Sequence, residues 1–231
     1  MSTVGAQILQ RLSEVESERR RRAADAALGA QVAAVKAYQH ARFEQSYADL
    51  LASTRFGAAA RFFLEDLYGP GDFVERDDQF VRIVPALVRL FPREIVGTVL
   101  DLAALHALSE QLDSGMAMAL GEAAVDGVSY GWAWREVGRP ADRDKQIALM
   151  LSVGAALDGY TRNIVLRHSL RLMRGPAHAA GLSSLQRFLE RGFDTFRAMR
   201  GADDFLATIS SHERALAAGL YAGHDGPAVT A

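Results

Sequence analysis

The stretch Phe62–Phe91, FFLEDLYGPGDFVERDDQFVRIVPALVRLF, contains a helix end, a sharp break and a new helix in quick succession. Gly69-Pro70-Gly71 predicts the break, because glycine accepts the left-handed conformation that ends a helix and proline cannot continue one. Beyond the break, apolar residues recur at helical offsets and form one face, made of Phe80, Ile83, Val84, Leu87, Val88 and Phe91. We therefore expect a rigid aromatic corner followed by a helix that buries this face in the core or in a homodimer.

Helical spacing continues on both sides of this stretch, and no alternating strand pattern or internal repeat interrupts it. Asp77 or Asp78 is expected to cap the helix after the break, and Pro85 is expected either to kink that helix or to lie where a new helix begins. The other predicted helices span residues 4–28, 31–51, 55–68, 93–120, 140–173, 183–199 and 203–221, with a short one around Trp132 and Trp134. The prediction is an all-α protein, a single multi-helix bundle of about eight or nine helices.

Three regions are expected along the chain. Residues 1–30 form a polar N-terminal helical extension, residues 31–222 the helical domain, and residues 223–231 a disordered tail. Arg19–Arg22 is read as a solvated helix face, because Glu16 and Glu18 precede it at pairing distance.

Composition excludes several classes of protein and site. Among 231 residues there is no cysteine, so disulfides and thiolate chemistry are excluded. The formal net charge of −2 gives no general attraction to nucleic acid or to an anionic membrane. Neither a signal peptide nor a run of about 20 apolar residues is evident. We expect a cytoplasmic protein that binds neither nucleic acid nor membrane.

A first candidate ligand-binding cluster combines two helical stripes. His106, Glu110 and Asp113 follow each other along one face of the helix after Pro92. Such a set can bind a divalent metal ion or do acid–base work, and the alternative is a structural network within the helix. A second stripe in the 140–173 helix carries Arg143, Asp158 and Arg162. Because buried charges need partners, we expect the two stripes to meet.

A second candidate cluster surrounds the predicted corner. Acidic residues and one phenol could line a cleft there; they are Glu65, Asp66, Tyr68, Asp72 and Asp77. The alternative is a structural corner, in which the acids favour the positive N-terminal end of the next helix.

Catalytic motifs give little support for an enzyme. Gly127-Val128-Ser129-Tyr130-Gly131 fits the Gly-x-Ser-x-Gly pattern, but the strand that must precede such a serine is missing, so residues 127–131 are predicted as a loop. No Glu-x-x-His, zinc-protease or phosphate-loop motif occurs. No cofactor and no metal site is expected.

Three segments resemble a family of uncharacterised bacterial all-helical proteins. They are Phe62–Asp77, Val84–Pro92 and Leu105–Asp113. The resemblance covers most of the chain after about residue 30, implies an all-helical fold and supplies no mechanism. We expect a non-catalytic protein that acts through a protein partner or a small ligand. The alternative is a metal- or cofactor-dependent enzyme that uses the buried His, carboxylate and Arg cluster.

Overall fold

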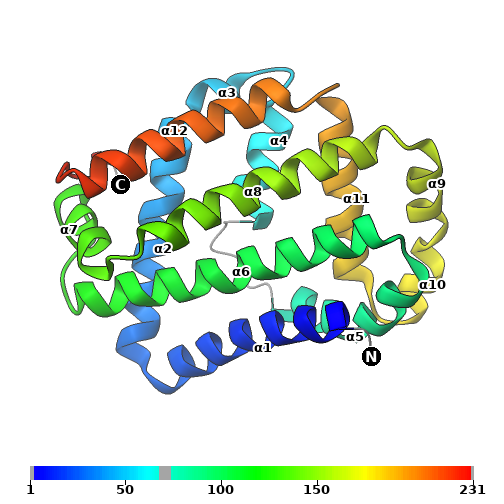
Figure 1. Ribbon diagram of the computed structural model, residues 1–231, viewed down its shortest axis with the longest axis horizontal. Helices are drawn as coiled ribbons and strands as arrows, with labels where there is room; N and C mark the ends of the chain where they lie inside the picture. Colours follow the sequence, from blue (N-terminus) through cyan, green and yellow to red (C-terminus); the bar gives the residue numbers. More distant parts are fainter. Residues whose placement is uncertain (1–2, 68–73, 230–231) are drawn as a thin grey trace.

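The computed structural model describes residues 3–67 and 74–229, and these residues form helices and connecting turns without any strand (Figure 1). The elements in chain order are α1 (Thr3–Ala24), α2 (Ala26–Ser46), α3 (Ala48–Ala52), α4 (Gly57–Phe62), the π-helix η1 (Phe63–Leu67), α5 (Val74–Leu90), α6 (Arg93–Leu120), α7 (Gly127–Val137), α8 (Pro140–Thr161), α9 (Ile164–Leu172), α10 (Arg174–Ala179), α11 (Ser183–Ala198) and α12 (Asp203–Tyr221).

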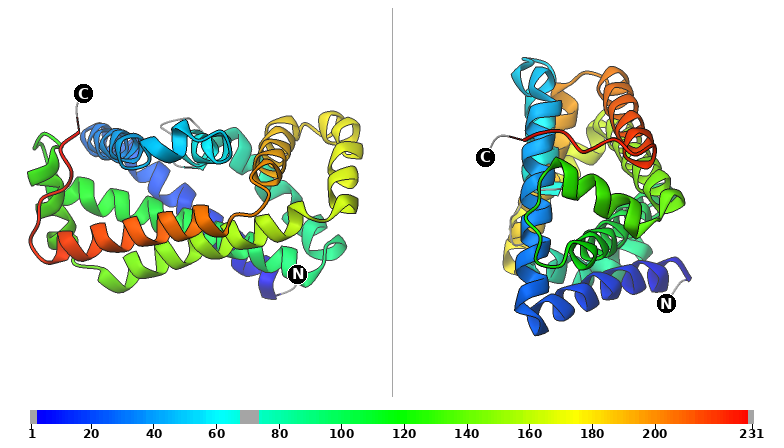
Figure 2. Two further views of the ribbon diagram at one scale, coloured as in Figure 1. Left: turned by 90° about the horizontal axis from the view of Figure 1, so that it is seen from above. Right: turned by 90° about the vertical axis from the view of Figure 1, so that its left-hand side faces the viewer.

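Helix α6 lies at the centre of the arrangement and packs against α1, α2, α7 and α8. Figure 1 shows α6, α8 and α12 alongside one another, with α2 and α11 crossing them steeply, and Figure 2 shows the same crossing from two other sides. Side-chain contacts from Ser109 to Gln146 and from Thr98 to Tyr160 make α6 and α8 antiparallel. The all-α class is confirmed, whereas a single bundle of aligned helices is not established.

Apolar burial falls into two clusters. The larger one contains the aromatic core, with Tyr47, Phe62, Tyr130, Phe196 and Phe205 fully buried. The smaller one joins α1, α5 and α6 through Ile8, Leu12, Val84, Leu87, Val96 and Ala103. Large buried aromatics dominate the energetics of such a core. Residues of both clusters line the site described below.

The described residues form more helical segments than the eight or nine predicted, in part because a side-chain cap divides the predicted 140–173 helix, and a second cap moves the break predicted between residues 28 and 31. Asp25 accepts a hydrogen bond from the Leu28 amide and starts α2, which separates it from α1. Asn163 accepts from the Val165 and Leu166 amides and starts α9 after α8. Asn and Asp are strong helix caps, so both breaks have a local cause.

The ends of the chain are more integrated than expected. Helix α1 buries Ile8, Leu12 and Val15 and packs along α6, so it is part of the core rather than an extension. The tail, expected to be disordered, is described as far as Val229. There the Tyr38 hydroxyl donates to the Pro227 carbonyl, and the Gly226 amide donates to the Gly127 carbonyl.

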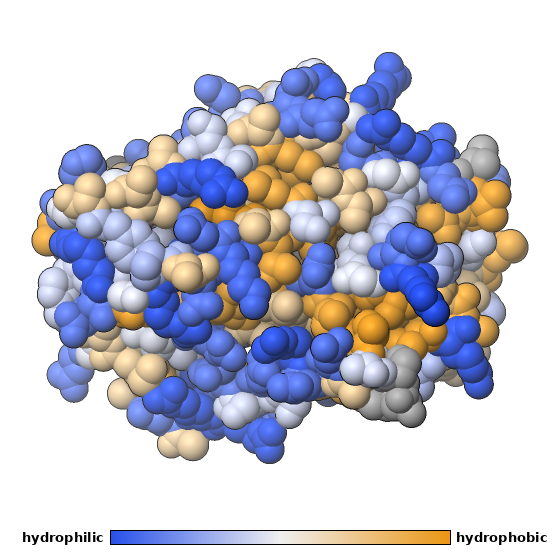
Figure 3. Space-filling model, viewed as in Figure 1, coloured by the Kyte–Doolittle hydropathy of each residue, from blue (hydrophilic) through white to orange (hydrophobic). Residues whose placement is uncertain are grey.

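The predicted corner and helix face can be compared with the structure in part. Gly69-Pro70-Gly71 lies outside the described residues, whereas Phe62 and Phe63, which precede it in the sequence, are buried as expected. In α5, Val84 and Leu87 are buried, but Phe91, just after the helix, is 47% exposed. Figure 3 shows apolar surface gathered near α5 and the start of α6. Helix α5 runs through Pro85, and Asp77 lies within the helix instead of capping it.

Helix α6 is long and apolar enough to cross a membrane by length and composition alone. The helix also carries much of the interior of this fold, with Leu112 and Met116 fully buried. The core helix of a water-soluble protein gives the same signal, so this observation does not argue for a membrane-spanning segment.

Candidate functional site

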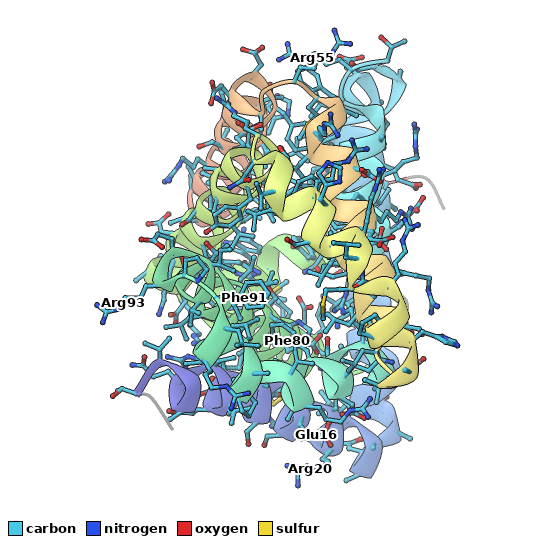
Figure 4. All side chains as sticks on the ribbon, turned by 90° about the vertical axis from the view of Figure 1, so that its right-hand side faces the viewer. Glu16, Arg20, Arg55, Phe80, Phe91 and Arg93 are labelled. Atoms are coloured by element: carbon cyan, nitrogen blue, oxygen red, sulfur yellow. The ribbon has the colours of Figure 1, made fainter. Side chains whose placement is uncertain are left out.

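A cavity of about 140 Å³ lies between α1, α2, α5, α6 and α11. Its apolar wall is formed by Leu12, Phe80, Val99, Leu102, Ala103, Leu105, Leu185, Phe188 and Leu189, and its polar side by Lys36, Gln39, Arg76, Asp77, His106, Ser109, Glu110 and Asp113. We call it the His106 cavity. Figure 4 looks onto the side of the molecule where Phe80 lies.

Asp77 is the centre of the first group of charges on the polar side. Nε2 of His106 lies 2.9 Å from its Oδ2, and Nε of Arg76 lies 3.1 Å from its Oδ1. The Nη2 atom of Arg19, from α1, also donates to Oδ2. Burial alone raises the pKa of Asp77, but the His106 hydrogen bond and the arginine charges outweigh it, so the pKa lies well below its usual range. Asp77 is therefore an ionised carboxylate that holds α1, α5 and α6 together.

Glu110 is the centre of the second group. Nζ of Lys36 lies 2.7 Å from Oε1, and Nη2 of Arg22 lies 2.6 Å from Oε2. Burial opposes ionisation of Glu110, yet the charge and hydrogen bond of Lys36 and the charge of Arg22 leave its pKa lowered. Each of these two carboxylates is thus flanked by cations from other helices.

Asp113, one turn further along α6, is less well compensated. Its Oδ1 accepts from Nε2 of Gln39 at 3.1 Å, and its nearest cation is Lys36 at 4.0 Å. Burial is the largest influence and raises the pKa of Asp113, because the more distant charges of Lys36 and Arg143 offset it only in part. The face predicted from His106, Glu110 and Asp113 thus lines one cavity with three different environments.

The expected meeting of the two stripes occurs at one end only. Arg143 lies near Asp113 and acts on it electrostatically. Asp158 and Arg162 pair with each other instead and line a separate cavity with Phe196 and other residues. Fifteen residues of helix separate Arg143 from Asp158, about 22 Å at 1.5 Å per residue. Asp158 and Arg162 are therefore not part of the His106 cavity, because antiparallel packing places them beside the start of α6.

The second predicted cluster is divided in the same way. Glu65 and Asp66 pair with Arg191 of α11 on the surface. Tyr68 and Asp72 lie outside the described residues. Asp77 joins His106 in the cavity described above, so one residue from each predicted cluster meets in space.

Several residues of the site were missed by sequence reasoning. Arg19 and Arg22 were expected on a solvated face, but of this arginine run only Arg20 pairs locally, with Glu16 at 3.6 Å. Arg19 and Arg22 instead continue the buried face of α1 that carries Leu12 and Val15, and that continuation was the available signal. For Lys36, the only hint in the sequence was that it is one of just two lysines in the chain. Gln39 and Ser109 carried none.

Motif chemistry finds no support in the described residues. Residues 127–131, predicted as a loop, begin α7. Ser129 and Asp126 form a reciprocal cap there, in which each side chain accepts from the other residue's amide. This cap gives Ser129 a structural role. Within residues 3–67 and 74–229, no three His, Asp or Glu side chains lie together in a way that would hold a metal ion.

The fold and the cavity define an all-α protein with an apolar cavity bounded by buried ion pairs. The chain belongs to the family described as a domain of unknown function (DUF8198), whose model matches residues 18–227. No curated protein and no solved structure gives a significant match. Membership agrees with the resemblance to an uncharacterised family, and it adds no activity.

Proposed function

We propose that this protein binds a small, largely apolar molecule with one hydrogen-bonding group in the His106 cavity and acts through that ligand. The single observation behind the proposal is the division of the cavity into an apolar wall and an ionic side. Ligand pockets typically combine apolar lining with a few placed polar groups.

The pairing of the charges sets the chemistry of the ligand. Asp77 and Glu110 are each already compensated by cations, so an ionic ligand that contacts either carboxylate would have to displace a partner. A neutral hydroxyl or amide can hydrogen-bond to the rim of such a network without breaking it. The volume is close to that of an engineered cavity that accepts benzene, about 150 Å³, so the ligand is of that order of size.

Calorimetric titration with phenol and benzene tests the proposal. We expect phenol to bind more tightly than benzene, because only phenol has a group for the polar side. Ala103 lines the cavity and is 1% exposed, so Ala103→Leu should fill the space and remove binding. Ala104→Leu adds the same bulk one residue further along α6, outside the lining, and should still bind. No binding of either compound, or equal binding by Ala103→Leu and wild type, would overturn the proposal.

Proton transfer by His106 is the second candidate function, and the 2.9 Å contact with Asp77 favours it. A carboxylate that orients an imidazole is a common device for general base catalysis. The test uses hydrolysis of 4-nitrophenyl acetate as a model reaction. This function requires a rate above background that His106→Gln removes and His178→Gln, at an exposed position, retains. Equal rates for wild type and His106→Gln would exclude it.

A further inference from the structure

A second cavity of about 80 Å³ lies on the other side of Gln39 from the His106 cavity, between α2, α7, α8 and α12. It is lined by Gln39, His40, Arg42, Phe43, Leu64, Tyr130, Trp134, Arg143, Gln146, Ile147, Met150, Ile209 and Glu213. We call it the Arg143 cavity. The function proposed above does not use it.

Arg143 is the unusual group in this cavity. Arg143 is only 4% exposed, and its guanidinium lies over the Trp134 ring, 3.8 Å from the ring centroid. Nη1 donates to Oε1 of Gln146 at 3.1 Å, whereas Nη2 is buried and has no hydrogen-bond partner among the described residues. A buried charge without an ion pair is costly, and a guanidinium stays charged under nearly all conditions.

No carboxylate in the described part of the chain forms an ion pair with Arg143. Asp113 acts on it through space, but the ion pairs of this region join Asp113 to Lys36 and Glu213 to Arg42. Burial has the largest influence on the pKa of Arg143 and lowers it. Tyr130 and Asp113 raise this pKa, but they offset the effect of burial only in part. The positive charge is therefore left largely uncompensated by the protein.

Two further donors in the lining also lack partners. Nε of Arg42 and Nε1 of Trp134 are buried without a hydrogen-bond acceptor in the described residues. The remaining nitrogens of the Arg42 guanidinium are held by Glu213, at 2.8 and 3.2 Å, so Arg42 is fixed in place. Among the lining residues, every side-chain atom that is buried without a partner is a donor. A site that offers donors and an excess of positive charge calls for an acceptor with negative charge.

The size of the space decides which anion is suitable. A water molecule needs about 10–15 Å³ of cavity volume. The Arg143 cavity, at about 80 Å³, therefore has room for a group of several non-hydrogen atoms. Waters could accept from the three donors, but they would leave the charge uncompensated. A planar carboxylate matches the fork of a guanidinium, with the indole ring as a flat wall.

We propose that the Arg143 cavity binds the carboxylate group of a small organic acid, with Arg143 as the main contact and Trp134 and Arg42 as additional donors. The site differs from the His106 cavity in ligand chemistry. It is independent of the proposed function, so either can fail alone.

Acetate is the probe, titrated by calorimetry and by thermal unfolding at an ionic strength held constant with sodium chloride. Acetate should bind the wild-type protein saturably and raise its unfolding midpoint. Arg143→Gln should lower the affinity about 10- to 100-fold, the loss expected when a charged hydrogen bond is removed. Arg162→Gln removes an exposed arginine from the end of the same helix and should bind as wild type does.

Trp134→Phe keeps an aromatic ring under Arg143 and removes only the indole N–H. It should weaken acetate binding several-fold, which keeps the proposal testable if Arg143→Gln does not fold. Acetate and chloride acting alike, or unchanged acetate binding in Arg143→Gln or Trp134→Phe, would overturn the proposal. Tighter binding of inorganic phosphate than of acetate would overturn the choice of a carboxylate.

Discussion

The His106 and Arg143 cavities share Gln39 in their walls, yet they treat buried charge in opposite ways. In the first, Asp77 and Glu110 are each flanked by cations from α1 and neighbouring helices. In the second, Arg143 is buried without a carboxylate within pairing distance in the described chain, because Asp113 pairs with Lys36 and Glu213 with Arg42. Protein charges that compensate each other stabilise the fold, whereas a buried charge without a partner in the protein points to a bound ligand of opposite charge. The difference predicts opposite results when each centre is neutralised.

The largest expected effect is at Asp77. Asp77→Asn should destabilise the protein by about 3 kcal/mol, because removing one member of a buried ion network leaves the others uncompensated. Urea unfolding at pH 7 measures the loss. The pKa of Asp77 is lowered in the fold, so its contribution is present above the unfolded value of about 3.9 and is lost as pH falls through the folded value. The difference between wild type and variant should therefore shrink below about pH 4.

Asp78→Asn is the matched control, because Asp78 is the exposed neighbour of Asp77 on α5. This control should stay within about 0.5 kcal/mol of wild type. A loss at Asp77 no greater than the loss at Asp78 would remove the distinction between the two cavities.

The next largest change in stability has the opposite sign from that of Asp77→Asn. Arg143→Met should make the ligand-free protein more stable by about 1 kcal/mol. It removes an unpaired buried charge and retains much of the side-chain volume, while losing the cation–π contact, itself worth about 0.5–2 kcal/mol. The same urea experiment at pH 7, without added organic acid, measures it. Destabilisation by several kcal/mol would mean that Arg143 has a structural partner after all.

The sequence predicts the fold better than it predicts the site, and particular residues show why. The spacing of Phe80, Val84 and Leu87 is a local signal, and the structure buries the last two. The caps at Asp25 and Asn163 were missed, since cap residues are also common in turns and within helices. Such local errors change where a helix ends without changing the all-α class.

The site depends on pairs that are distant in sequence. Arg19 and Asp77 are 58 positions apart, and Lys36 and Glu110 are 74 apart. Helical periodicity places His106 and Glu110 on one face, but it does not predict which helix lies against that face. The antiparallel packing of α6 and α8 then brings Arg143 near Asp113 and takes Asp158 away. Which stripes meet is thus decided by tertiary packing.

Asp113, which lines the His106 cavity, should show a pH dependence opposite to that of Asp77. Its pKa is raised in the fold by burial, so its contribution to stability is fully present below the unfolded value and is lost as pH rises through the folded value. Asp113→Asn keeps the oxygen that accepts from Gln39. The variant should be more stable than wild type at pH 7, by less than the gain from Arg143→Met, and the gain should disappear toward pH 4. A gain that grows as pH falls would contradict the raised pKa.

The smallest expected effect belongs to the exposed ion pair between Arg20 and Glu16, whose outward positions on α1 are visible in Figure 4. Their nitrogen and oxygen atoms are 3.6 Å apart, farther than the 2.6 and 2.7 Å of the two Glu110 pairs, and their side chains are 69% and 48% exposed. Water screens such a pair, so Arg20→Gln should cost no more than about 0.3–0.5 kcal/mol, less still in 1 M salt. Arg19→Gln, one residue earlier on the same helix, removes a partner of Asp77 whose side chain is only 18% exposed, and should cost several times more. Equal losses of stability in the two variants would show that burial does not determine how much an ion pair of this protein contributes. The contrast between the two cavities would then lose its physical basis.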